Sequence, residues 1–432
     1  MNHQAISNRR ALIVLTTIFF MWGMINSLND VLIPHLRAVF SLSYTQAMLV
    51  QLTFFGAYFL MSLPGGKLLG YLGYKRTIST GLFIAGSGAL LFYPAARLPS
   101  YPLFLLALFV LSTGITLLQV SANPYASRLG SEATASSRLN FTQAFNSLGG
   151  IVAPALGGLL ILSGSVLGVA ELAKLGPAQQ LAYRVEQAQA VQLPYLGLAG
   201  LLFALSVLVY RLKLPDFQDA GDNTQSGGRL GEVLRWPHVR LGVVAMFLYV
   251  GAEVAISSFL INYISQSHIG NVSERNAAFY VSLYWGLGMV GRLLGSMLLR
   301  YIPPGRLLGL NAIACAALCI VTLFSEGLVA MWSLVSIGFF NAIMFPTIFT
   351  LGIATLGPLT GRASSLLVMA IVGAAIVPMA QGIVADLIGL QVSFIMPLFC
   401  YLYVIFYGFK GSRVTAASAQ VLPVQGIRLT TR

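Results

Sequence analysis

Charge is scarce in this sequence. Only 9% of its 432 residues are charged, whereas soluble globular domains carry about 25%. Hydrophobic residues make up 57% of the chain, so there is too little polar surface to face water on every side. This scarcity excludes an ordinary soluble domain and predicts a chain that crosses a membrane several times.

Cysteine is also rare, and the three present, Cys315, Cys319 and Cys400, lie inside apolar runs. None is spaced like a metal or redox motif, so we interpret them as small buried residues. The sequence also has no phosphate-binding loop, no zinc-protease motif and no serine-hydrolase motif. These absences argue against an ATP-driven pump, and we expect no enzyme activity, no metal and no organic cofactor.

Long apolar segments account for most of the chain. A membrane-spanning helix needs about 20 apolar residues, and twelve segments meet this requirement. They are 11–35, 45–72, 76–97, 101–127, 136–163, 191–212, 238–266, 275–301, 305–325, 328–356, 361–388 and 391–411. The first is too long for a signal-peptide core, so we interpret it as a retained helix. The prediction is an all-α membrane protein with twelve transmembrane helices.

The chain divides into two related parts. We expect a six-helix half at 1–213, a polar cytoplasmic linker at 214–240, and a second six-helix half with a cytoplasmic tail at 241–432. GKLLG at 66–70 matches GRLLG at 291–295. In the same way, GGIVAP at 149–154 in the fifth helix of the first half matches GAAIVP at 373–378 in the fifth helix of the second half. Repeated halves are typical of transporters in which the two halves rock about a central site.

The distribution of positive charge gives the orientation. With a cytoplasmic N-terminus, most of the 25 lysine and arginine residues fall on the cytoplasmic side. The exceptions are Arg37, Arg97, Lys174, Arg184 and Arg275. This bias follows the positive-inside rule and predicts an inner-membrane protein with both termini in the cytoplasm. Orientation thus explains the net charge of +13; we expect a monomer in lipid and no nucleic-acid partner.

Two acidic residues lie deep in the predicted helices, Asp30 in the first half and Glu253 in the second. An unpaired charge in hydrocarbon is costly, and we expect no lysine or arginine at their depth. A carboxyl group held in this way is suited to carrying a proton. Asp30 is either a proton carrier or a protonated residue that is hydrogen-bonded to a neighbouring helix. Glu253 either binds substrate hydroxyls, carries a proton or fixes its helix.

Carboxamides are dense at membrane depth. Neighbours such as Gln119 and Asn123, or Gln143 and Asn146, are three or four residues apart and so share a helix face. Such groups both donate and accept hydrogen bonds, as a sugar requires, although they also join helices without any ligand. The predicted substrate contacts are Asn26, Gln119, Asn123, Gln143, Asn146, Glu253, Trp285 and Asn341.

Three segments, NDVLIP at 29–34, SANPY at 121–125 and LNFTQAFNSLG at 139–149, carry a resemblance to a known family. The sequence resembles the major facilitator superfamily, and within it the fucose–galactose–glucose proton symporter family. The resemblance implies two six-helix halves, alternating access and a proton as coupling ion. It also implies that Asp30 couples the proton and that Asn146 contacts sugar.

The sequence departs from the fucose symporter pattern in two places. Gln119 stands where the fucose symporter has a second coupling glutamate, and Glu253 stands where it has a glutamine. Both departures resemble the glucose/galactose permease branch, which implies proton-coupled hexose uptake. Fucose or N-acetylglucosamine symport, a sodium-coupled or facilitative sugar carrier, a drug exporter and a membrane enzyme remain alternatives.

Overall fold

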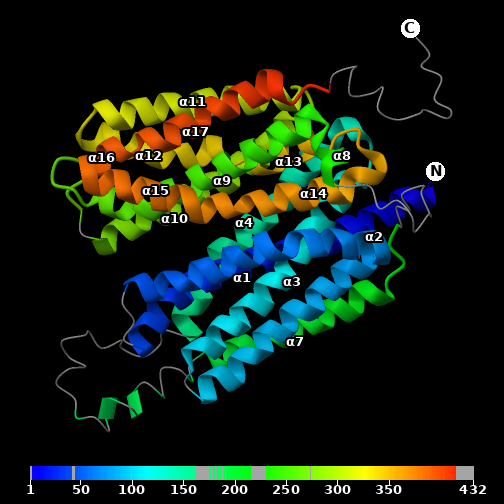
Figure 1. The fold of residues 1–432 in the computed structure, drawn as a ribbon, viewed down its shortest axis with the longest axis horizontal. Helices are drawn as coiled ribbons and strands as arrows, with labels where there is room; N and C mark the ends of the chain where they lie inside the picture. Colours follow the sequence, from blue (N-terminus) through cyan, green and yellow to red (C-terminus); the bar gives the residue numbers. More distant parts are fainter. Residues whose placement is uncertain are drawn as a thin grey trace.

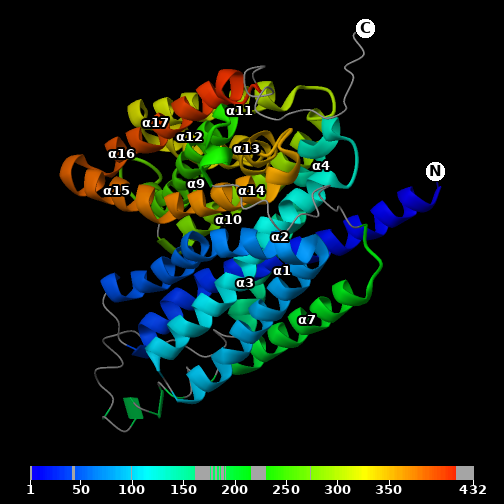
Figure 2. The same ribbon diagram turned by 45° about the vertical axis from the view of Figure 1, so that its right-hand side comes forward.

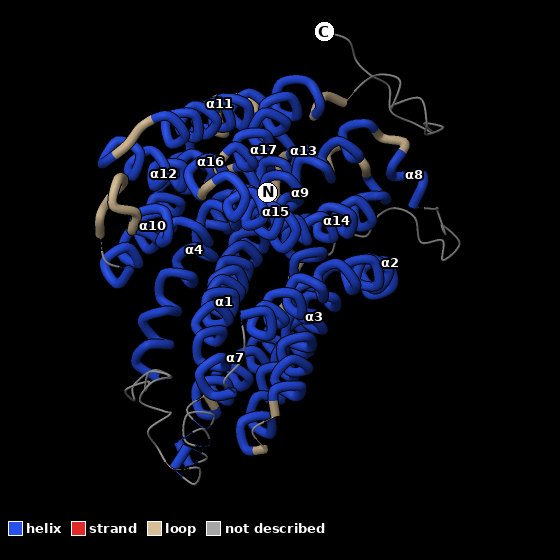
Figure 3. Tube along the Cα trace, turned by 60° about the vertical axis from the view of Figure 1, so that its left-hand side comes forward, coloured by secondary structure: helices blue, strands red, loops and turns tan. Residues whose placement is uncertain are grey.

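A computed structural model of the chain describes residues 2–40, 44–98, 100–160, 191–215, 230–272 and 274–414, with a few isolated positions between 176 and 189. Its regular structure there is entirely helical (Figure 3). The elements of the first half are α1 (Asn2–Phe40), α2 (Tyr44–Arg97), α3 (Tyr101–Arg128), η1 (Glu132–Thr134), α4 (Ala135–Leu160) and α7 (Gln192–Arg211). The second half follows the short helix α8 (Leu230–Leu234). It comprises α9 (Pro237–Ile264), α10 (Glu274–Leu298), α11 (Pro304–Phe324), α12 (Gly327–Asn341), α13 (Met344–Gly352), η2 (Gly357–Leu359), α14 (Thr360–Met369), η3 (Ala370–Val372), α15 (Gly373–Ile388), α16 (Leu390–Ser393), α17 (Ile395–Phe406) and η4 (Tyr407–Gly411).

The prediction of an all-α membrane protein is confirmed. In the described residues, nine helical segments are long and apolar enough to cross a membrane. One of them lies in α2, whose 54 residues would extend about 80 Å as one straight helix, against a hydrocarbon core of about 30 Å. Gly73, with φ 72° and ψ 174°, interrupts α2 and divides it into two helices. The predicted twelve spans require α2 to count as two and α4 and α10 to be included.

The helices form two groups in space. Helices α1, α2, α3 and α7 lie together, and α9 to α17 form the second group (Figures 1 and 2). Helix α4 packs on α1 and also contacts α10 and α13 across the boundary. Residues 161–190, apart from a few isolated positions, and residues 415–432 lie outside the described residues, as does 216–229 of the predicted linker.

The internal repeat has a physical counterpart in helix packing. A Cβ atom on Gly149 of α4 would lie 2.1 Å from the carbonyl oxygen of Phe20 on α1. A Cβ atom on Gly373 of α15 would lie at the same distance from the carbonyl oxygen of Phe247 on α9. The first and fifth segments of each half therefore cross with their backbones in contact, which only glycine permits.

The two halves are joined at one end of the bundle, which we name the terminal end. It carries α8 and the first turns of α1 (Figure 1). Here Arg128 at the end of α3 donates to the Gly357 carbonyl and the Thr360 hydroxyl, at 2.9 and 3.0 Å. Further bonds join the first turns of α4 to the ends of α10 and α13: Ser136 to Thr350, Ser137 to the Ser296 carbonyl, and Asn140 to Thr347.

Substitution of Gly23 by alanine should destabilise the protein. A Cβ atom there would lie 1.8 Å from the carbonyl oxygen of Asn146, so α1 and α4 would have to separate. Overpacking of this kind costs about 1–3 kcal/mol, and we expect a lower thermal unfolding midpoint in detergent. Gly56→Ala is the matched control, because nothing lies within 4 Å of its Cβ position. Equal midpoints for the two variants would contradict the close crossing.

Candidate functional site

Glu253 is held by a tyrosine one turn earlier on α9. The Tyr249 hydroxyl donates to Glu253 Oε1 at 2.8 Å and lies 3.3 Å from the Asn341 carbonyl oxygen. Residues four apart share one helix face, so α9 presents the hydroxyl and the carboxylate together. The contact fixes the carboxylate at the end of α12.

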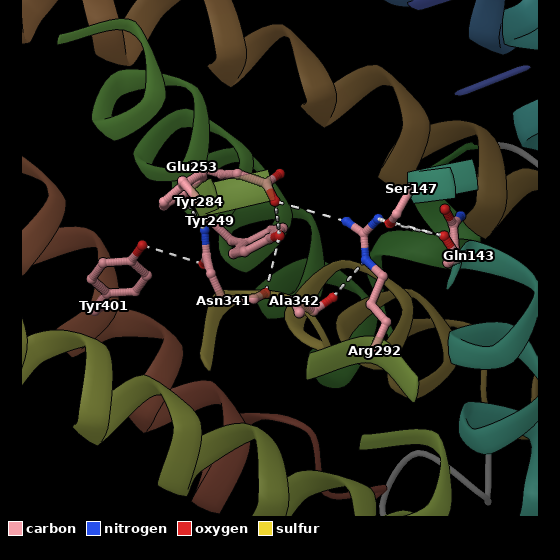
Figure 4. Close-up of polar contacts among 9 residues, drawn as sticks. All are labelled: Gln143, Ser147, Tyr249, Glu253, Tyr284, Arg292, Asn341, Ala342 and Tyr401. Atoms are coloured by element: carbon pink, nitrogen blue, oxygen red, sulfur yellow. Dashed lines mark hydrogen bonds and ion pairs between the residues drawn. The ribbon is translucent and has the colours of Figure 1, made fainter. Parts of the chain in front are cut away.

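Arg292 on α10 lies between the two halves (Figure 4). Its Nη2 atom is 3.9 Å from Glu253 Oε1, and the two side chains are only 11% and 13% exposed. Its Nε donates to the Ala342 carbonyl at 3.1 Å. Its Nη1 donates to the Ser147 hydroxyl and, at 3.5 Å, to the Gln143 carbonyl, both on α4. One guanidinium therefore contacts α9, α4 and the end of α12.

The expectation that no cation lies at the depth of Glu253 is wrong. Counting Arg292 among the cytoplasmic charges placed it at the surface, although the predicted helix 275–301 extends beyond it. In α10, which ends at Leu298, Arg292 lies about 9 Å inside the end of the helix. A buried carboxylate is far less costly beside a cation than alone, and the structure supplies that cation from the neighbouring helix.

A second polar cluster lies in the first half. Gln143 Nε2 donates to Asn123 Oδ1 at 3.2 Å, and both side chains are buried. Gln119 is buried one turn before Asn123, and the Tyr58 hydroxyl lies beside it. The buried amide atoms Gln119 Oε1, Asn123 Nδ2 and Asn26 Oδ1 have no hydrogen-bond partner among the described residues. Buried polar atoms normally have partners, so these three atoms mark a candidate place for a ligand.

Two predicted contact residues instead join helices. Asn146 Nδ2 donates to the Phe19 carbonyl at 3.1 Å, which ties α4 to α1. Asn341 Nδ2 donates to the Tyr284 hydroxyl at 3.1 Å, and its Oδ1 accepts from the Tyr401 hydroxyl at 3.2 Å. Asn341 is 1% exposed, and both of its amide atoms are used inside the second half.

A small hollow, with room for about one water molecule, lies where the halves meet. The residues that line it come from α4, α9, α10 and the end of α12. They are Ser147, Glu253, Tyr284, Trp285, Gly288, Arg292, Gly338 and Ala342. Of the predicted contacts, Glu253 and Trp285 face this hollow, and Gln143 adjoins it through Arg292. The side chain of Asp30 lies outside the described residues; its backbone is part of α1.

Sequence reasoning missed Arg292, Tyr249 and Ser147. Two signals were available. Tyr249 precedes Glu253 by one helical turn, and Arg292 is the counterpart of Lys67 in the repeated GKLLG and GRLLG segments. Neither signal gives the depth of a side chain, because depth depends on how α10 packs against α4 and α9.

The helices and the hollow together define a helical membrane protein with a polar site between two halves. The Major Facilitator Superfamily model matches residues 13–371. The chain is 48% identical to a glucose/galactose transporter of Brucella abortus, over 93% of this chain and 94% of that one. It is 36% identical to the L-fucose-proton symporter of Escherichia coli, over 93% of both chains. A crystal structure of the Escherichia coli fucose:proton symporter superposes with a TM-score of 0.86 at 34% identity, covering 93% of this chain and 98% of that chain. This protein belongs to the major facilitator superfamily.

Substitution of Asn341 by alanine should lower stability. The change leaves the Tyr284 and Tyr401 hydroxyls without their buried partner, which costs about 1–3 kcal/mol. The measurement is thermal unfolding of purified protein in detergent. Asn311→Ala serves as the control, since the bond of Asn311 among the described residues goes to the Leu307 carbonyl of its own helix. An Asn341→Ala variant as stable as this control would show that the tyrosine contacts are not structural.

Proposed function

We propose that this protein carries a hexose of the glucose or galactose type across the membrane together with a proton, by alternating access. The relatives named above support this proposal, because they transport glucose and galactose or couple L-fucose to a proton. We also propose that the protein works as a monomer in the inner membrane. The terminal end would then face the cytoplasm.

The observation that carries the proposal is the polar hollow between the halves. Glu253 and Arg292 are ionisable side chains inside an apolar bundle. Arg292 connects them to the opposite half through its hydrogen bond to Ser147 on α4. A site built from both halves is reached from one side or the other as the halves rock. The halves of this protein are joined at the terminal end. A crystal structure of the related fucose:proton symporter shows that protein in its outward conformation.

The chemistry of the first-half cluster and of the hollow together suits a neutral polyhydroxylated ligand. Gln119 Oε1 and Asn26 Oδ1 can accept from hydroxyls, and Asn123 Nδ2 can donate. Glu253 adds a carboxylate, and Trp285 adds an aromatic surface for the apolar face of a sugar ring. A drug exporter would have an apolar and aromatic cavity, which this set does not resemble.

A panel of labelled sugars in proteoliposomes tests the assignment. We expect uptake of glucose or galactose to exceed that of fucose and N-acetylglucosamine, and a pH gradient to drive accumulation. If a sodium gradient drives uptake and a pH gradient does not, the coupling ion is sodium and not a proton. Uptake that only equilibrates would indicate a facilitative carrier, and no flux of any sugar would refute the proposal.

Asp30→Asn should abolish proton-driven accumulation of sugar while sugar counterflow continues. The amide cannot release a proton, whereas exchange of sugar across the membrane needs no net proton movement. Accumulation and counterflow are measured in the same vesicles. Asp386→Asn is the control, because Asp386 is an exposed carboxylate on α15. Continued accumulation by Asp30→Asn would remove this residue from the coupling mechanism.

Gln119→Ala should weaken sugar binding by about 1–3 kcal/mol, the usual effect of leaving a buried polar partner unsatisfied. Equilibrium binding of each transported sugar measures this change. Gln381→Ala is the matched control, because Gln381 is also a buried glutamine but bonds Ser393 within the second half. Equal affinities for wild type and Gln119→Ala with every sugar would exclude Gln119 from the site.

A further inference from the structure

The two oxygens of the Glu253 carboxylate have different surroundings. The Tyr249 hydroxyl donates to Oε1 at 2.8 Å, and the Nη2 atom of Arg292 lies 3.9 Å from the same oxygen (Figure 4). Among the described residues, Oε2 has no hydrogen bond, although each carboxylate oxygen can accept two. Because both neighbours lie on the side of Oε1, Oε2 is the oxygen left to accept from a ligand.

The Tyr249 hydroxyl is itself held in place by the second half. The side chain is fully buried, and its other acceptor, the Asn341 carbonyl oxygen, lies 3.3 Å away. A hydroxyl has one proton to donate, and the shorter, charge-assisted bond to Glu253 is the stronger of the two. The Asn341 side chain is fixed in turn by Tyr284 and Tyr401. Tyr249 therefore attaches the carboxylate to a rigid part of the bundle.

The hollow beside Glu253 leaves little choice of what Oε2 can meet. Its room for about one water molecule is also room for about one hydroxyl group. Ser147, which also lines the hollow, accepts from Arg292 and donates to the Gln143 carbonyl. Ser147 and Arg292 are thus already hydrogen-bonded on α4, and Glu253 is the acceptor that remains for an incoming hydroxyl.

We propose that Tyr249 is a positioning residue of the site. Its hydroxyl holds Oε1 of Glu253, so that Oε2 accepts a hydrogen bond from one hydroxyl group of the transported sugar. Tyr249 acts through Glu253 and does not touch the sugar. Without Tyr249, the carboxylate is free to turn and pair with Arg292 through both oxygens, and the acceptor is lost. The bond to the sugar rests on the proposed function, whereas the contact between Tyr249 and Glu253 does not.

Equilibrium binding of monodeoxy sugars to the purified full chain tests this role. Each analogue lacks one hydroxyl group of the transported hexose. Tyr249→Phe keeps the ring and removes only the hydroxyl, and we expect the Kd for the complete hexose to rise about tenfold, which corresponds to 1.4 kcal/mol. Glu253→Gln should also weaken binding of the complete hexose. For the one analogue that lacks the recognised hydroxyl, neither substitution should change the affinity further, because the bond is already absent.

Tyr263→Phe is the matched control. Tyr263 is also a fully buried tyrosine of α9, but its hydroxyl donates to the Thr322 carbonyl, and this variant should bind every sugar as wild type does. A merely structural role of Tyr249 would weaken the binding of all the sugars by the same factor. Such a uniform loss in Tyr249→Phe, or wild-type affinity for the complete hexose, would overturn the proposal.

Infrared spectra of the sugar-free protein test the contact separately. In pH-difference spectra, the carbonyl band of protonated Glu253 is the one that is missing from Glu253→Gln. Loss of a hydrogen bond raises the stretching frequency of a carbonyl group, so this band should move to higher wavenumber in Tyr249→Phe and stay in place in Tyr263→Phe. An unchanged band in Tyr249→Phe would refute the contact. If the band moves but wild type binds no hexose, the positioning of Glu253 stands and the substrate assignment falls.

Discussion

The structure depends on the neutralisation of one carboxylate inside an apolar bundle. Glu253 is 13% exposed, and an isolated ion in that environment is strongly disfavoured. Arg292 supplies the opposite charge, and Tyr249 supplies a hydrogen bond. Arg292 also donates to Ser147 on α4 of the first half. The residue that neutralises Glu253 in the second half therefore also helps to hold the two halves together.

Close helix crossings make this arrangement possible. The glycines at the crossing of α1 with α4, and of α9 with α15, allow backbones to touch where any side chain would intervene. In lipid, helices associate through such packing and through polar contacts, because no water is expelled between apolar surfaces. The glycines hold α4 and α9 in fixed positions within their own halves. Ser147 and Glu253 are thereby presented to Arg292 from opposite sides.

The carboxamides divide into two kinds that look alike in the sequence. Gln119, Asn123 and Asn26 keep amide atoms without partners, whereas Asn341 has both of its amide atoms bonded to tyrosines. The difference arises from the neighbours that other helices bring, and Tyr401 lies on α17, far from Asn341 in the chain. Spacing along one helix predicts a shared face, but it does not predict what covers that face.

The sequence by itself determined the membrane class, the helices and the repeat, because apolar length and charge scarcity are properties of the chain. It also predicted Glu253 and Trp285 as substrate contacts, and both line the hollow between the halves; the resemblance it carried agreed with the family. Only the tertiary structure decided that Arg292 lies inside the bundle, that Tyr249 and Ser147 belong to the site, and that Asn341 is held by tyrosines. The placements of Arg292, Ser147 and Asn341 depend on contacts between helices that are distant in the chain, and a one-dimensional pattern does not record the distance between such helices.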